Sequence, residues 1–156
     1  MISSEVILLA HPTFGALAIM ATVWVFVETL NVNSSNIGRL RAVSGIGAVL
    51  MWLTYIVGGY WYVVSYAADK AIIKAGPWSF AHDFVMETKE HVFLMLLLLS
   101  TFLVIVTSAD LVKNKGAKKL ALWTAAFVIL TGFAMEGSGA LIAMGTKVGL
   151  LAQTAA

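Results

Sequence analysis

Four long apolar runs limit what this chain can fold into. They cover residues 5–30, 42–64, 82–108 and 120–144, each near or above the ~20 residues that a helix needs to cross ~30 Å of hydrocarbon. Inside a bilayer the backbone must satisfy its own hydrogen bonds, and helices do this without leaving an open sheet edge. The sequence therefore predicts four transmembrane helices.

The composition excludes several other classes of protein. Hydrophobic residues make up 60% of the 156 residues and charged residues 12%, whereas soluble domains have about 45–50% and about 25%. This excludes a disordered chain, a nucleic-acid binder and an ordinary cytosolic enzyme. The chain has no cysteine. Its sequence therefore excludes disulfides, thiolate metal sites, iron–sulfur clusters and covalently attached c-type haem. We expect one domain, residues 1–156.

The connections between the runs indicate the topology. They are short, so neighbouring helices should be antiparallel, which predicts an all-α, up-down-up-down four-helix bundle in the membrane. Six of the ten basic residues lie in the first and third connections: Arg39, Arg41, Lys113, Lys115, Lys118 and Lys119. By the positive-inside rule, residues 31–41 and 109–119 are cytoplasmic and both termini extracytoplasmic, in what we expect to be a prokaryotic cytoplasmic membrane. An aromatic belt is predicted at the outer boundary, from Tyr60, Trp61, Tyr62, Tyr66 and Trp78.

Unusual residues of all four runs fall at one depth. Ionisable side chains within a bilayer are costly, so they are functional candidates. At 1.5 Å of rise per residue, His11, the pair Gly58-Gly59, His91 and Glu136 all lie roughly 9–14 Å from the outer boundary. The sequence therefore predicts that each helix contributes one of these features to the same layer of the bundle.

The spacing of two histidines decides which of them faces the interior. His82 and His91 are nine residues apart, about half a turn out of phase and about 13.5 Å apart along a helix. They cannot both bind one iron. Since His82 shares its side with Lys89, which should extend toward water or lipid headgroups, we expect His91 inside and His82 at the exposed boundary.

Two features of the first run bear on the position of His11. Pro12 predicts either a kink inside a helix or the start of a helix with His11 at its cap, and both alternatives stay open. At the other end of the run, Glu28 is expected to pair with Arg39 or Arg41.

The layer of His11, Gly58-Gly59, His91 and Glu136 suits a b-type haem. Haem iron takes axial imidazoles, and the flat ring needs close backbone approach, which glycine permits. Each ligating imidazole also needs a partner for its second ring nitrogen, such as Glu136 or a carbonyl freed by Pro12. We expect His11 and His91 as axial ligands, Gly58 and Gly59 against the ring, and Glu136 tuning the site.

The chain resembles the small four-helix membrane b-type cytochromes in four features: the four spans, His11-Pro12 near the outer end of the first, Gly58-Gly59 in the second and His91 in the third. The resemblance implies a membrane electron-transfer subunit with haem b, exchanging electrons with a quinone or a periplasmic redox partner. Asp83 or Glu87 would accept a proton from a quinol. With three histidines in the chain, a second bis-histidine haem is excluded.

Two other functions stay open. The small size and the apolar surface of every helix also suit a cofactor-free assembly subunit of a larger membrane complex. Alternatively, His11, His91, Glu87 and Glu136 could form a transition-metal site or an ion pathway, because mixed imidazole and carboxylate ligands suit zinc, copper or iron.

Overall fold

The computed structural model describes residues 4–155, and the side chains of residues 6–155, as an all-helical protein. The elements are α1 (Ser4–Leu30), α2 (Ile37–Ala75), the π-helical turn η1 (Ala81–Met86), α3 (Glu87–Ser108) and α4 (Lys115–Thr154). Since η1 runs directly into α3, the chain forms four helical rods, each long and apolar enough to cross a membrane. The prediction of four membrane-spanning helices is confirmed at this level.

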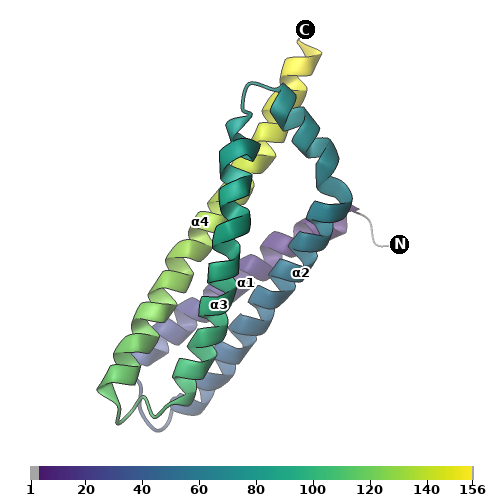
Figure 1. Cartoon of the computed structure of the whole chain (residues 1–156). Helices are drawn as coiled ribbons and strands as arrows, with labels where there is room; N and C mark the ends of the chain where they lie inside the picture. The colour runs from purple at the N-terminus through teal and green to yellow at the C-terminus, as the bar shows by residue number, and fades with distance from the viewer. Residues whose placement is uncertain (1–3, 156) are drawn as a thin grey trace.

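The rods form an elongated bundle with two different ends (Figure 1). The connections 31–36 and 109–114 lie together at one end, which we call the two-loop end. The connection 76–80 lies at the opposite, one-loop end. Helices α1 and α3 each pack against α2 and α4 and do not contact one another, so they are diagonal partners in the bundle.

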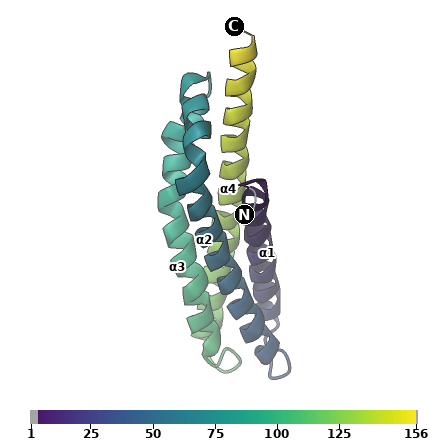
Figure 2. The same cartoon turned by 90° about the vertical axis from the view of Figure 1, so that its right-hand side faces the viewer.

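Two helices are longer than the sequence predicts. Helices α2 and α4 have 39 and 40 residues, or about 60 Å each, against 27 residues for α1. The predicted membrane spans end at residues 64 and 144, whereas α2 continues to Ala75 and α4 to Thr154. In α2 the segment after Val64 is rich in alanine and has no helix breaker before Gly76-Pro77. Figure 2 shows the start of α1 well below the ends of α2 and α4.

The buried apolar residues form three clusters along the bundle. The first lies at the two-loop end and includes Val25, Leu40, Leu103 and Ala125, one from each rod. The second, in the middle, includes Ala18, Met51, Leu96 and Val128. The third contains Tyr66, Ile73, Ala81, Val85, Met86 and Ile142, and none of these belongs to α1. The bundle therefore changes from four packed helices to three toward the one-loop end.

Small residues let α2 and η1 approach α4 at the one-loop end. A Cβ atom on Gly149 would lie 2.7 Å from the Ile72 carbonyl oxygen, and one on Gly145 would lie 2.7 Å from the Ala81 Cβ. Glycines four residues apart lie on one helix face and permit this close packing in membrane helices. The contact closes the bundle above the start of α1.

The two-loop end uses its charges to satisfy helix ends. Glu28 pairs with Arg39, at 2.6 Å between Oε1 and Nη2, which confirms the first of the two expected partners. Arg41 instead donates to the carbonyl oxygens of Thr107, Ser108 and Ala109 at 3.0 Å each, where α3 ends. These carbonyls have no partner within the helix, so the guanidinium satisfies them and complements the helix dipole.

Candidate functional site

His11 lies on a helix and packs into a gap on α2. Helix α1 continues through Pro12 back to Ser4, so the alternative in which the helix starts at Pro12 is removed. A Cβ atom on Gly58 would overlap the His11 imidazole, so the ring occupies the space that this glycine leaves open. Its Nδ1–H donates to the Thr54 carbonyl oxygen at 2.9 Å. Because a carbonyl only accepts, Nδ1 carries the proton and Nε2 keeps its lone pair.

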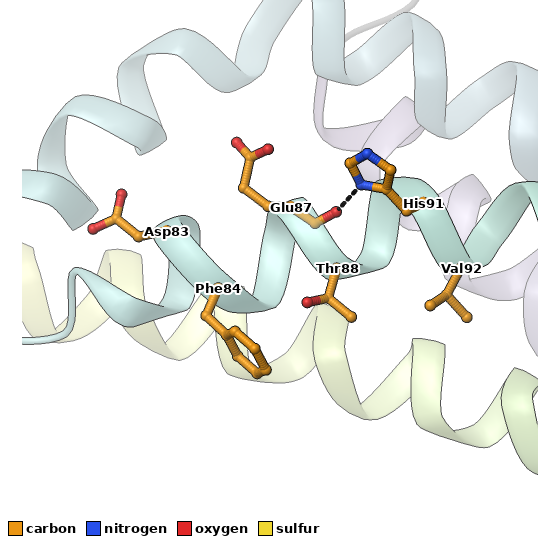
Figure 3. A pocket seen from close by; sticks show the side chains of 6 residues that line it. All are labelled: Asp83, Phe84, Glu87, Thr88, His91 and Val92. Atoms are coloured by element: carbon orange, nitrogen blue, oxygen red, sulfur yellow. Dashed lines mark hydrogen bonds between the residues drawn. The ribbon is translucent and has the colours of Figure 1, made fainter.

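His91 has the same hydrogen-bonding pattern on α3. Its Nδ1–H donates to the carbonyl oxygen of Glu87, one turn earlier, at 2.7 Å (Figure 3). As in His11, the Nε2 atom then carries a lone pair that can accept a hydrogen bond or bind a metal ion. In Figure 3 the side chains of His91 and Glu87 point to one side of α3, and those of Phe84 and Thr88 point to the other. His91 is exposed on the chain, so the prediction that it faces the bundle interior is wrong.

A surface depression of ≈ 350 Å³ surrounds His91. The residues that line it all belong to η1 and α3: Asp83, Phe84, Glu87, Thr88, His91 and Val92. The lining of this depression combines an aromatic ring and an aliphatic side chain with two carboxylates, a hydroxyl and an imidazole. Two of its members have further partners, because Asp83 pairs with Lys74 at 3.3 Å and Glu87 faces His82.

His82 is the buried histidine, contrary to the prediction. Its side chain is 2% exposed, and both of its ring nitrogens face partners. Nδ1 lies 3.1 Å from the Tyr66 hydroxyl, and Nε2 lies 3.8 Å from the Glu87 carboxylate. The phase argument fails for two reasons. The wide π-helical turn changes the angle per residue at His82, and the unexpected length of α2 brings Tyr66 over it.

Glu136 and Lys89 bring opposite charges into the bundle. A Cβ atom on Gly15 would overlap the Glu136 carboxylate, and one on Gly139 would lie 3.2 Å from the Lys89 ammonium. The two charges attract each other, and Lys89 is also within electrostatic reach of His11. Lys89 is half-buried against α4, so the expectation that it extends away to water or headgroups is wrong.

The layer predicted from depth therefore divides into two groups. His11, Gly58 and Thr54 form a contact between α1 and α2, while Gly15, Glu136, Lys89 and Gly139 form another that joins α1, α3 and α4. Glu136 and Gly15 also line a cavity of ≈ 10 Å³ among all four rods, with room for at most one water molecule. Gly59 has open space around its Cβ position and lies outside both groups.

Two residues of this region were missed by sequence reasoning, and the reasons differ. Thr54 acts through its backbone, so no side-chain pattern marks it. Lys89 is marked by its position within an apolar run, but only the three-dimensional contact with Gly139 shows the direction of its side chain.

Among the side chains of residues 6–155, no three His, Asp or Glu side chains come together as a possible metal site. The predicted non-haem metal centre from His11, His91, Glu87 and Glu136 thus has no support from these contacts. No protein-family model, curated protein or solved structure matches this chain.

Proposed function

We propose that this chain is a membrane electron-transfer subunit that holds one b-type haem through His11 and His91. The observation that carries the proposal is the hydrogen-bonding pattern that the two histidines share. Each donates its Nδ1–H to a backbone carbonyl and keeps the Nε2 lone pair free. Histidines that bind metals are almost always held this way, since the bond on the second nitrogen fixes the tautomer and orients the ring.

The contrast with His82 supports the choice of ligands. His82 faces the Tyr66 hydroxyl with one nitrogen and the Glu87 carboxylate with the other, so it has no nitrogen left for iron. His11 and His91 lie on the diagonal helices α1 and α3, and their Nε2 atoms would hold the haem iron.

The residues present fit haem chemistry in a further respect. The haem would supply a one-electron carrier within the membrane, with a potential set by its axial ligands and their surroundings. Two imidazoles would hold the iron, Thr54 and Glu87 would orient them through their carbonyls, and the charges of Lys89 and Glu136 would act on the site from α3 and α4.

The electron partners follow from placement in the membrane. With the two-loop end in the cytoplasm, as the basic residues predict, the histidines lie in the extracytoplasmic half of a prokaryotic cytoplasmic membrane. A quinone in the bilayer or a periplasmic redox protein would then exchange electrons there. Glu87 or Asp83 in the depression beside His91 would accept a proton from a quinol.

The absorption spectrum of the protein purified from haem-supplied cells tests the proposal. We expect a Soret band that is lost in His11→Ala and in His91→Ala and retained in His82→Ala, the matched control. A wild-type protein that lacks the band after haem loading would refute the proposal. Equal loss in all three variants would refute this choice of ligands.

The interior charges favour a second candidate, an ion pathway. A lysine and a carboxylate at membrane depth are typical of proton and ion routes. In this case proteoliposomes would show an ion flux that Glu136→Gln abolishes and that the presence of haem does not affect. Flux that is equal with and without the protein would remove this candidate.

A further inference from the structure

Tyr66 and His82 form a buried polar pair that the proposed haem site does not use. Both side chains are 2% exposed, and the Tyr66 hydroxyl lies 3.1 Å from His82 Nδ1. The pair sits in the third apolar cluster, between α2, η1 and α4, where an aliphatic pair would pack without needing any hydrogen bond. Because packing alone does not require a hydrogen-bonded pair at this position, we expect its chemistry to have a role.

The neighbouring carboxylate sets the direction of the hydrogen bond. His82 Nε2 faces Glu87 Oε1 at 3.8 Å, so the proton of a neutral imidazole is best placed on Nε2. The lone pair of Nδ1 then faces Tyr66, whose O–H donates to it. In this arrangement the phenolic proton is hydrogen-bonded directly to its acceptor, His82 Nδ1. The Glu87 carboxylate stabilises the imidazolium that forms after the proton is transferred.

Oxidisable rings surround the same phenol. Tyr62 stacks on Tyr66 with ring centroids 5.2 Å apart and an interplanar angle of 24°, and Trp61 lies at 5.5 Å and 48°. The Tyr62 phenol lies within electrostatic reach of the carboxylates of Glu90 and Glu87. Trp61 and Tyr62 are half-buried, so they connect the buried phenol to the surface of the one-loop end.

We propose that Tyr66 is a redox-active tyrosine. A high-potential transition-metal centre of a partner molecule, acting at the one-loop end, takes one electron from the phenol, directly or through Trp61 or Tyr62, and is itself reduced by one electron. The O–H bond breaks, the proton moves to His82 Nδ1, and a neutral tyrosyl radical remains beside an imidazolium. A one-electron donor and return of the proton restore the starting state. This role goes beyond the proposed haem function and does not depend on it.

The test is photo-oxidation of the full chain in detergent, without haem. A photoexcited ruthenium tris-bipyridine complex with a sacrificial electron acceptor supplies the oxidant, and electron paramagnetic resonance records the frozen product. We expect a tyrosyl signal whose yield falls several-fold in Tyr66→Phe, which keeps the ring and its packing. Tyr60→Phe, which removes the hydroxyl of an exposed tyrosine, is the matched control and should leave the yield unchanged.

A second variant tests the proton acceptor. His82→Gln keeps Tyr66 but removes the imidazole, and it should lower the yield of the tyrosyl radical, as Tyr66→Phe does. In the wild type we expect radical formation to be slower in D₂O than in H₂O, because a proton moves with the electron, and this difference should be absent in His82→Gln. Ring-deuterated tyrosine should narrow the signal, which separates it from a tryptophan radical. No tyrosyl signal in the wild type, or an equal yield in Tyr66→Phe and Tyr60→Phe, would overturn the proposal.

Discussion

The two halves of the bundle use their polar residues in opposite ways. At the two-loop end Arg41 and Lys118 bind the carbonyls that end α3 and α1, and Glu28 pairs with Arg39 across the first connection. In the other half, His11, Lys89 and Glu136 turn inward and are accommodated by glycines on neighbouring helices. Charges of the first kind are explained by the folding of the chain. Charges of the second kind cost stability, which indicates that they serve a function.

The largest expected effect comes from the interior charges. Lys89→Met leaves Glu136 without the attraction of the ammonium in an apolar layer, and we expect a loss of about 3 kcal/mol in the free energy of unfolding. Unfolding by SDS, followed by tryptophan fluorescence, measures it. Lys147→Met, on an exposed face of α4, is the control and should change stability by less than about 0.5 kcal/mol.

A double variant sharpens this result. Lys89→Met with Glu136→Gln removes both charges and should cost less than the sum of the two single variants, because neither charge is then left alone. Additive costs would mean that the two groups do not interact.

The next effect tests the contact between His11 and Gly58. Gly58→Val places a side chain where the His11 ring lies, and we expect a loss of about 1–3 kcal/mol together with loss of haem binding. Gly59→Val is the matched control, since nothing lies within 4 Å of its Cβ position. Equal stability of the two variants would contradict the packing described for His11.

A smaller effect is expected from the capping of α3 at the two-loop end. Arg41→Gln removes the charge from three hydrogen bonds to helix-terminal carbonyls, which we expect to cost about 1 kcal/mol. The Soret band should remain, because this end is separate from the histidines. A variant that loses haem without losing stability would break the distinction between the two halves.

The smallest effect is expected for the exposed ion pair. Glu28→Gln should lower the free energy of unfolding slightly in low salt, and by less in 1 M salt, where screening acts over about 3 Å. Unfolding of wild type and variant at both salt concentrations measures it. A cost that is independent of salt would indicate that Glu28 acts through its hydrogen bond with Trp24 instead.

Much of the fold was predictable from the sequence, because crossing a bilayer imposes length and apolarity on a helix. The four rods follow from those constraints, and the basic residues of the first connection limited the expected partner of Glu28 to Arg39 or Arg41. The extra turns of α2 and α4 do not, since beyond the apolar layer only helix propensity acts, and no apolar run marks where such a segment ends.

The depth of the site residues along the bundle was predictable from the sequence, but the directions in which their side chains point were not. Counting residues placed His11 and Gly58 at one level, and the structure brings them into contact. The positions of His82 and His91 were exchanged, because one π-helical turn and one unforeseen neighbour, Tyr66, decide which imidazole is covered. Local periodicity contains neither piece of information.

The length of α4 has a consequence for how the protein sits in a membrane. Transmembrane helices tilt by up to ~40°, and at that angle a 40-residue helix still projects about 46 Å along the bilayer normal. The hydrocarbon layer is only ~30 Å thick. No tilt within this range places the whole of α4 in the hydrocarbon layer. Several of its turns therefore lie in the headgroup layer or the water beyond, within reach of molecules that never enter lipid.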